Sequence, residues 1–370
     1  MANIARVSIP STLFPILPSG PTGMARLAAQ AAHADDGHLI EFKTLEARSI
    51  LNKSVSKRQL WMAYSINPYR GCEFGCKYCY ARYTHEFLQP VKASVTEPPR
   101  LSEVQQPFAL AFEREIYLKD NAAWLLEQEL KKIDPRQEIA LGTATDPYQP
   151  IERRVGITRS LLEVFAKHEG FRLGIVTKST LIARDIDLLT KIAAKNRLVV
   201  HLTITSTDSA LTRILEPRAP RPDLRFATVR KLRDAGIVTG VLCSPLLPGI
   251  TDNERALDSV AKKAAAAGAS FFAAQPLFLK SCSRPTYLSF VREHFPHLAA
   301  DYAQRFAKLD FADAPYRSHL ALMVKRVCHK HGLPERFSDA LLTRDASDIR
   351  KAPTGVRGAS ACGSQGLLFA

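Results

Sequence analysis

The stretch Asn67-Pro-Tyr-Arg-Gly-Cys72-Glu-Phe-Gly-Cys76-Lys-Tyr-Cys79-Tyr80 places three cysteines within eight residues, directly after the short β-type run Tyr64–Asn67. Spacings of four and three residues allow three thiolates to face one metal centre from a single loop, and Gly71 and Gly75 permit the tight turns that this needs. A structural zinc site and a simple electron-transfer cluster each require four ligands. Three thiolates therefore favour an iron–sulfur cubane with one iron left open to bind a substrate.

The other cysteines do not suggest disulfide bonds. The chain has seven cysteines, an odd number, and those outside this loop are scattered without a pairing spacing: Cys243, Cys282, Cys328 and Cys362. Metal ligation in a reducing compartment explains this usage better than disulfides do. A zinc site completed by Cys282 or His85 is the alternative metal centre, and buried cysteines without any metal are a further alternative.

From Tyr64 onward, short β-type apolar runs alternate with amphipathic segments of helical length. We predict strands at Tyr64–Asn67, Glu138–Thr143, Arg172–Lys178, Leu198–Thr205, Ile237–Cys243 and Ser270–Gln275. Between them we predict helices at Asn121–Lys132, Thr158–His168, Leu181–Lys195, Asp223–Ala235 and Asn253–Ala267, several of which stop at a glycine. After Pro276 the alternation ends, and residues 289–332 have the pattern of helices.

This alternation indicates an α/β protein whose parallel strands are joined by right-handed crossovers. Six strand–helix units are too few for a complete eight-unit barrel, so we predict a partial (β/α)6 TIM-like barrel with its chemistry at the carboxyl ends of the strands. An open doubly wound sheet is the alternative fold. The predicted domains are an N-terminal extension (1–60, poorly ordered at its start), a core barrel (61–276), a helical C-terminal extension (277–350) and a flexible tail (351–370).

Composition sets limits on location and partners. No apolar run approaches the roughly 18 residues that a membrane-spanning helix needs, and prolines interrupt the apolar residues between Ile9 and Leu17. We therefore expect a cytoplasmic protein without a membrane partner. The net charge of +15 favours a polyanionic partner such as nucleic acid, although a basic enzyme with many surface lysines and arginines explains it equally well.

Basic residues are concentrated between Arg213 and Arg233, where seven of them occur. Spread over a loop and a helix, they could follow a phosphate backbone. Their helical spacing also fits a solvated helix face, with Phe226, Val229 and Leu232 directed inward and the charges directed outward. The spacing favours this second interpretation, because it needs no partner.

The motif Cys72-x3-Cys76-x2-Cys79, with an aromatic residue before the last cysteine, resembles the signature of the radical S-adenosylmethionine (SAM) superfamily. The surrounding Asn-Pro-Tyr-Arg-Gly-Cys and Cys-Tyr-Ala-Arg resemble its spore photoproduct lyase-related branch. The resemblance extends from about Arg48 to Gln275. It includes Gly142-Thr-Ala-Thr-Asp146-Pro-Tyr-Gln149-Pro-Ile-Glu152, Val176-Thr-Lys178-Ser, Leu215-Glu-Pro-Arg218-Ala-Pro and Pro245-Leu-Leu-Pro-Gly249-Ile-Thr-Asp252. Together these motifs are specific to the superfamily, but they do not specify a substrate.

The resemblance implies a [4Fe–4S] cluster on Cys72, Cys76 and Cys79 whose open iron chelates the amino and carboxylate groups of SAM. One electron, from a reductant of the flavodoxin or ferredoxin type, would break the C5′–S bond and give methionine and a 5′-deoxyadenosyl radical. That radical would abstract a hydrogen atom from a substrate that is unknown, with a nucleic acid as one candidate. The alternatives are an iron–sulfur binding or electron-transfer protein, and a nucleic-acid-binding protein, without SAM cleavage.

The same resemblance implies residues that bind SAM, although no residue is identified as catalytic. Lys178 would pair with the methionyl carboxylate, and Thr203, which matches a serine of that branch, would contact the same moiety. Tyr80, directly after the cluster, would shield it or stack near the adenine. An exposed lysine, an ordinary strand threonine and a packed tyrosine are the alternative interpretations.

Three further polar residues belong to loops after predicted strands. Asp146 and Glu152 lie after the second strand, where acceptors for the methionine ammonium are chemically apt. Arg218 follows the fourth strand and would bind a carboxylate or a phosphate. Loop solvation, capping and loop bracing are the alternative roles.

One position departs from the spore photoproduct lyase pattern. Those enzymes carry a cysteine after the second strand that returns a hydrogen atom to the product, and the matching position here holds Thr143. A threonine O–H is a far poorer hydrogen-atom donor than a thiol, so spore photoproduct lyase activity itself is not expected. Cys243, at another strand end, is the substitute donor that the sequence offers.

The last residues, Gln365-Gly366-Leu367-Leu368-Phe369-Ala370, resemble the peptides by which bacterial repair and replication proteins dock on the DNA sliding clamp. Leu368 and Phe369 would enter an apolar groove while Gln365 makes hydrogen bonds. The alternative is a terminal apolar segment that folds back onto the protein.

Overall fold

The computed structural model describes residues 39–53, 63–88 and 107–334. Internal contacts divide the chain into a unit of residues 1–40 and a unit of residues 41–370, and every element below belongs to the second unit. The predicted start of the N-terminal extension and the predicted tail lie outside the described residues. No helix within the described part of the chain is long and apolar enough to span a membrane.

The main sheet has seven strands in the order β10-β9-β8-β7-β6-β3-β2. Six of them are parallel, and the short β2 pairs with β3 in the antiparallel sense. The bounds are β2 Leu51–Lys53, β3 Tyr64–Ile66, β6 Glu138–Leu141, β7 Arg172–Thr177, β8 Arg197–Thr203, β9 Thr239–Leu246 and β10 Phe272–Pro276. The parallel strands confirm the six that were predicted.

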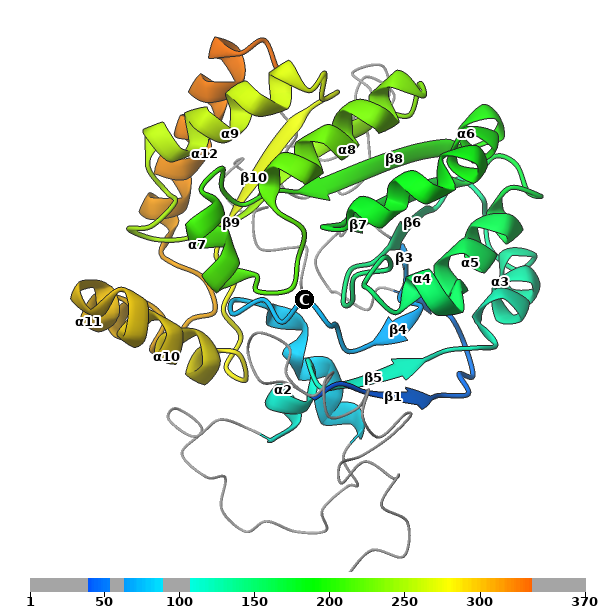
Figure 1. The fold of residues 1–370 in the computed structure, drawn as a ribbon, viewed down its shortest axis with the longest axis horizontal. Coiled ribbons are helices and arrows are strands. Elements are labelled where there is room, and N and C mark those ends of the chain that lie inside the picture. The colour runs from blue at the N-terminus through cyan, green and yellow to red at the C-terminus, as the bar shows by residue number, and fades with distance from the viewer. Residues whose placement is uncertain (1–38, 54–62, 89–106, 335–370) are drawn as a thin grey trace, which may run out of the picture. The chain divides into compact units, whose positions relative to one another are not determined.

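The parallel strands follow one another in chain order across the sheet. A doubly wound sheet requires the order to reverse at a switch point, so the structure supports the partial barrel rather than that alternative. Helices cover the outer side of the strands (Figure 1). The described helices between β3 and β10 are η1 Tyr80–Leu88, α2 Pro107–Ala111, α3 Ala122–Leu130, α4 Glu152–Val155, α5 Ile157–Phe165, η2 Thr180–Asp185, α6 Ile186–Lys195, α7 Ser209–Leu215, α8 Pro222–Asp234 and α9 Glu254–Ala266.

Local sequence signals account for these helix boundaries. The Asn253 side chain caps α9 by accepting a hydrogen bond from the Ala256 backbone N–H at 2.9 Å. Gly268, with φ +73°, follows the end of α9 in the left-handed conformation that glycine adopts without strain. Pro222 occupies the first turn of α8, where its missing N–H costs no hydrogen bond. Four of the five predicted helices are confirmed to within a few residues, and the one predicted at Leu181–Lys195 is divided into the 3-10 helix η2 and the α-helix α6.

A second, three-stranded sheet in the order β1-β5-β4 was not predicted. It joins β1 Glu41–Thr44, β4 Tyr69–Arg70 and β5 Glu115–Leu118, and it lies beside the loop that follows β3 (Figure 1). The strands are short, and β1 pairs in parallel with a segment more than 70 residues away. Such pairing leaves no local periodicity in the sequence, which explains why it escaped prediction.

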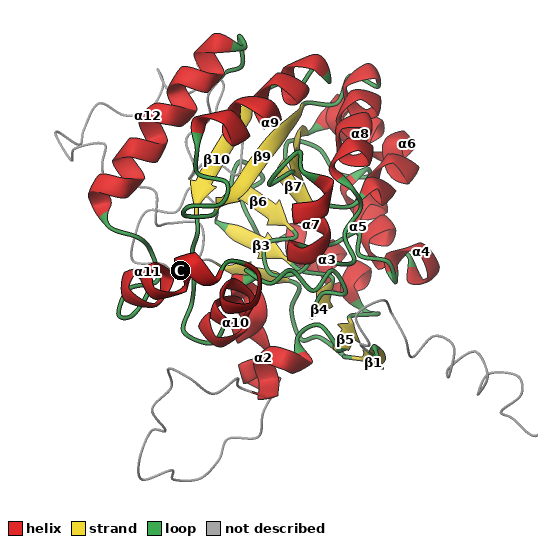
Figure 2. Cartoon of the chain, turned by 60° about the vertical axis from the view of Figure 1, so that its left-hand side comes forward, coloured by secondary structure: helices red, strands yellow, loops and turns green. Residues whose placement is uncertain are grey.

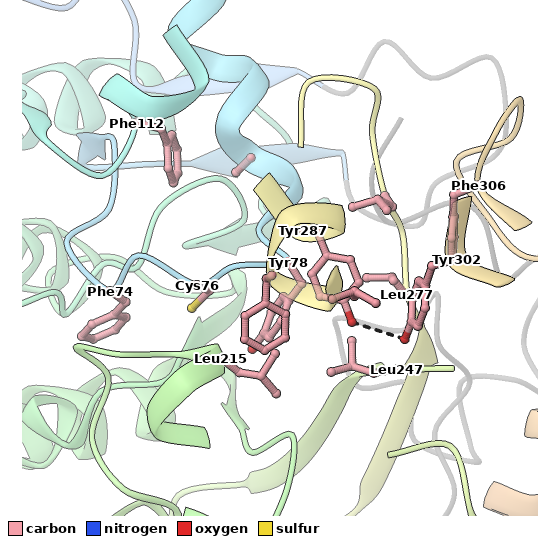
Figure 3. Packing of buried hydrophobic residues seen from close by; sticks show 14 of the residues in the cluster. Phe74, Cys76, Tyr78, Phe112, Leu215, Leu247, Leu277, Tyr287, Tyr302 and Phe306 are labelled. Carbon is pink, nitrogen blue, oxygen red and sulfur yellow. Dashed lines mark hydrogen bonds between the residues drawn. The ribbon is translucent and has the colours of Figure 1, made fainter. Parts of the chain in front are cut away.

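Helices from the C-terminal part of the chain pack against the cysteine loop, which we define as residues 67–80. They are α10 Arg284–His294, the 3-10 turn η3 Pro296–Leu298 and α11 Ala299–Arg305, whereas α12 Ala314–Lys330 packs against α9 and β10 (Figure 2). One apolar cluster contains Phe74 and Tyr78 of the loop together with Tyr287 of α10 and Tyr302 of α11 (Figure 3). The loop is thus enclosed between the strand ends and these helices.

Candidate active site

The three clustered cysteines line one cavity at the carboxyl ends of the parallel strands. The cavity holds about 980 Å³ of space, part of it open to solvent. Besides the cysteine loop, its walls come from the residues that end β6, β7, β8, β9 and β10: Gly142, Thr143, Ala144, Thr145, Asp146, Val176, Thr177, Lys178, Thr203, Leu242, Ser244, Pro245, Gln275 and Pro276.

The first half of the cysteine loop is held by its backbone. Gly71 has φ +88°, and a Cβ there would lie 2.6 Å from the Glu115 carbonyl oxygen, so only glycine fits. Thr145 donates from its hydroxyl to the Gly71 carbonyl at 2.6 Å. Glu73 is fixed at both ends, because its N–H donates to Gln149 at 2.8 Å and its carboxylate accepts from the Ile151 N–H at 2.6 Å.

The second half of the loop is held by two buried arginine–glutamate pairs. On the outer side, Arg82 donates to the Cys76 carbonyl at 3.2 Å and pairs with Glu113 at 3.0 Å. On the strand side, Tyr78 donates from its hydroxyl to Glu216, which pairs with Arg225. These contacts fix the carbonyls and side chains around the thiols and so hold the loop in position.

The three thiols are poor acids in this structure. Burial raises the pKa of Cys76 to about 12, partly opposed by the positive charge of Lys178. Burial also raises the pKa of Cys72 and of Cys79. A thiolate at these positions therefore needs a cation to compensate its charge, and metal binding would release protons from the loop.

Lys178 supplies a positive charge in the same cavity. Burial lowers the pKa of Lys178, but the negative charges of Cys76 and Glu216 outweigh this effect and raise it overall. Its ammonium lies 5.6 Å from the centroid of the Tyr78 ring, within the range of a cation–π contact. The chain itself thus keeps a cation facing the cavity.

Asp146 lines the cavity, but its carboxylate is occupied by the protein. One oxygen accepts from the Thr177 hydroxyl at 2.6 Å and from the Tyr148 N–H at 2.9 Å, and the other accepts from the Lys178 backbone N–H at 2.7 Å. Burial raises the pKa of Asp146 in spite of these hydrogen bonds. The contacts observed in the structure fix the end of β7, and with it the start of the Lys178 side chain.

The other predicted SAM-binding residues divide into two groups. Thr203 ends β8 and lines the cavity, as does Tyr80, whose hydroxyl donates to the Thr143 carbonyl. Glu152 and Arg218 do not line it. Glu152 accepts from the Thr158 N–H at 2.8 Å and from Arg184 at 2.8 Å, and Arg218 donates to the Glu73 carbonyl behind the loop. A SAM contact for Glu152 or Arg218 remains a prediction, and both residues brace loops in this structure.

The candidate hydrogen-atom donors lie in different places. Thr143 lines the cavity. Cys243 is buried but does not line it, because Leu242 and Ser244 on either side point to the cavity and successive side chains of a strand face opposite ways. The Cys243 thiol lies 3.6 Å from the Thr205 carbonyl oxygen instead.

The alternative zinc ligands are not part of the cavity wall. His85 Nε2 lies 2.9 Å from the Glu115 carbonyl oxygen, and the Cys282 sulfur lies 3.7 Å from the Ser283 hydroxyl. Across the described ranges, no group of three or more His, Cys, Asp or Glu side chains is arranged to hold a single metal ion. In an iron–sulfur cubane each thiolate binds a different iron, so its thiols stand apart around the cluster. Three thiols on the wall of a cavity that also contains an ammonium fit a cluster and an anionic ligand beside it.

Sequence reasoning missed Glu216 and Arg225. Arg225 was interpreted as part of a solvated helix face, and that interpretation is wrong for this residue, because its side chain is only 1% exposed. The signal was present in the spacing. Arg225, Val229 and Leu232 stand at i, i+4 and i+7, which is one face of α8, and the two apolar members are buried.

Comparison with known proteins adds three findings. The family model described as the radical SAM superfamily matches residues 66–259. An uncharacterized protein of Mycobacterium tuberculosis is 29% identical over 331 residues, which cover 89% of this chain and 92% of that protein. An uncharacterized protein of Methanocaldococcus jannaschii is 29% identical over 191 residues, 52% of this chain and 63% of that protein.

Solved structures of spore photoproduct lyase share the fold. The complex with dinucleoside spore photoproduct matches with a TM-score of 0.55 at 16% identity and covers 86% of this chain and 85% of that one. A double mutant with bound SAM and the same dinucleoside matches with a TM-score of 0.55 at 15% identity, with coverage of 85% and 84%. At this identity the likeness concerns the arrangement of the elements.

Proposed function

Because the chain belongs to the radical SAM superfamily and is a radical SAM enzyme, we propose that it cleaves SAM reductively at a [4Fe–4S] cluster held by Cys72, Cys76 and Cys79. When bound, the cluster supplies the electron that splits SAM into methionine and a 5′-deoxyadenosyl radical, which abstracts a hydrogen atom from the substrate. A single observation carries the proposal. The three thiols line the same cavity as the Lys178 ammonium.

The chain's own residues position and shield the reactants. Lys178 binds the methionyl carboxylate, and Asp146 directs it by accepting from the Lys178 backbone N–H at 2.7 Å. Thr203 offers a hydroxyl on the neighbouring strand end. Tyr80 is fixed by its hydrogen bond to the Thr143 carbonyl, so its ring covers the adjoining part of the cavity and excludes water there.

The decisive experiment measures 5′-deoxyadenosine formed by anaerobically reconstituted protein supplied with SAM and dithionite. We expect product from the wild-type protein and none from the Cys76→Ala variant. Bound metal is analysed in both proteins. Zinc in place of iron, or a fully loaded cluster that yields no product with any substrate offered, would overturn the proposal.

We propose a nucleic acid as the substrate class. The net charge of +15 supports this choice, and so does the shared fold with spore photoproduct lyase, whose solved complexes contain a dinucleoside photoproduct. Thr143 stands where spore photoproduct lyases carry the cysteine donor, so the proposal is a related reaction on nucleic acid and not spore photoproduct lyase activity itself. Ultraviolet-damaged DNA and modified RNA, each beside its unmodified counterpart, should raise 5′-deoxyadenosine formation selectively, and equal rates with all of them would contradict the proposal.

The remaining partners are proposals of the same kind. A flavodoxin or ferredoxin supplies the electron in the cytoplasm. To test this, dithionite in the assay is replaced by the purified carrier together with NADPH and an NADPH-dependent reductase of that carrier. Residues Gln365, Leu368 and Phe369 dock on the DNA sliding clamp, and they lie outside the described residues. Competition of a peptide of residues 361–370 with a known clamp ligand tests the docking, and absence of binding at high micromolar peptide would end the idea.

A further inference from the structure

Arg225 and Glu216 form a buried ion pair directly behind the wall of the cavity. Each side chain is 1% exposed, and the guanidinium Nη2 lies 2.5 Å from the carboxylate Oε2. Glu216 stands at the end of α7 and Arg225 in the first turns of α8, so the pair joins two helices that follow β8. Neither residue lines the cavity.

The rest of the Arg225 guanidinium is bound to backbone. Nε donates to the Pro220 carbonyl at 2.6 Å, and Nη1 donates to the Thr203 carbonyl at 3.1 Å. The second contact ties the pair to the end of β8, whose Thr203 lines the cavity. With three fixed contacts, Arg225 has one orientation, and that orientation directs its charge at Glu216.

Glu216 is also fully occupied. While Oε2 accepts from Arg225, Oε1 accepts from the Thr205 hydroxyl at 3.0 Å and from the Tyr78 hydroxyl. The Tyr78 ring in turn lies 5.6 Å from the Lys178 ammonium. Tyr78 therefore stands in contact with both the carboxylate and the ammonium.

Lys178 is left without an anionic partner of its own. Within the described residues, no carboxylate lies within ion-pair distance of its ammonium, whereas Glu216 is close enough for each charge to shift the pKa of the other group. An unpaired buried glutamate here would attract the lysine, because opposite charges interact strongly where water is excluded. In this structure Arg225 holds that glutamate instead.

We propose that Arg225 is a positioning residue that occupies Glu216 and so keeps the Lys178 ammonium free to bind the carboxylate of SAM. The inference rests on the proposed function, in which Lys178 makes that contact. A role in stability alone is a poor explanation for the pair, because desolvation cancels most of the attraction between buried charges. A pair of apolar side chains would stabilise the same place equally well.

The test is a double-mutant cycle in the full-length, cluster-loaded protein, with the dissociation constant of SAM as the readout. In Arg225→Met the freed Glu216 captures Lys178, and we expect SAM to bind about tenfold more weakly or worse. In the Glu216→Gln, Arg225→Met double variant no carboxylate competes, and binding returns to within about threefold of wild type. Thermal unfolding and iron content are measured for every variant.

A role in packing gives the opposite pattern, because the double variant would then bind SAM as weakly as Arg225→Met or more weakly. That result in a folded, iron-loaded double variant would overturn the inference. If Arg225→Met does not fold, the double variant still tests the inference, because clearly weaker SAM binding by a folded, iron-loaded double variant would overturn it.

Arg159→Met is the matched control. Arg159 pairs with the buried Asp185 at 2.7 Å, away from the cavity, so its loss should lower the melting temperature without changing SAM affinity. These measurements also distinguish failure of the inference about Arg225 from failure of the proposed function. A wild-type protein that holds iron but neither binds nor cleaves SAM refutes that function, whereas a SAM-binding wild type with no rescue refutes only the role of Arg225.

Discussion

The two walls of the cavity differ in how they are built. The loop wall, residues 72–80, carries the thiols and has little regular structure, and it is fixed from behind by buried side chains of distant segments. The strand wall carries Lys178 and Thr203 at the ends of β7 and β8, where the sheet register places them. From this contrast we predict that changes in the loop wall mainly affect metal loading, and that changes at Lys178 and Thr203 in the strand wall mainly affect SAM affinity.

The largest effect is expected from removing a thiol of the loop wall. Cys72→Ala leaves the cluster with two ligands, so we expect loss of bound iron and a fall in 5′-deoxyadenosine formation beyond the roughly 100-fold that loss of a supporting residue causes. Iron analysis and product quantification measure both. Cys328→Ala is the control, because Cys328 is buried in α12 away from the cavity and its loss should leave iron unchanged.

The next effect is expected from the strand wall. Lys178→Met removes the cation that faces the cavity, and loss of one charged hydrogen bond should weaken SAM binding about 10–100-fold. Iron content should stay at the wild-type level, since the lysine does not hold the loop. Equilibrium binding of SAM measures the change, with the exposed Lys167→Met as control. A parallel loss of iron in Lys178→Met would show that the two walls are not independent.

A smaller effect is expected at the back of the loop wall. Gly75 has φ +61°, and a Cβ there would lie 2.3 Å from an Arg218 nitrogen and 2.8 Å from a Glu113 oxygen. Gly75→Ala should therefore lose about 1–2 kcal/mol of stability from the left-handed backbone and lower iron loading as the neighbours shift.

Gly156→Ala separates these two consequences. Gly156 has φ +67° with nothing within 4 Å of the added Cβ, so it carries the backbone cost without the displacement. The melting temperature should be lower than that of the wild type in both variants, whereas iron content should fall only in Gly75→Ala. Equal iron content in the two variants would mean that Arg218 and Glu113 do not hold the loop.

Much of this architecture was predictable because it is local. The strands from β6 to β10 are largely apolar, as expected of parallel strands that are covered on both faces. The helices between them have apolar faces and terminal signals such as Asn253 and Gly268. The motif of Cys72, Cys76 and Cys79 is equally local, since its spacing lies within one loop. The positions of Lys178 directly after β7 and of Thr203 at the end of β8 are local in the same way.

The small sheet and the support of the loop were not predictable in this way. Glu216 and Arg225 are nine residues apart in sequence, yet their partners Tyr78 and Thr203 come from two other parts of the chain. A charged residue on a helix is usually solvated. Arg225 can be recognised as an internal residue only because it lies on the buried face of α8.

The sequence by itself determined the order of the six parallel strands and the helices between them, the three thiols and the superfamily chemistry, because each depends on residues close together along the chain. Only the tertiary structure decided which polar residues face the cavity. It placed Lys178 and Thr203 on the cavity wall. It placed Glu152 and Arg218 away from the cavity, where their hydrogen bonds brace loops. The physical reason is that a buried charge takes the nearest partner in space, and that partner is set by packing between distant segments.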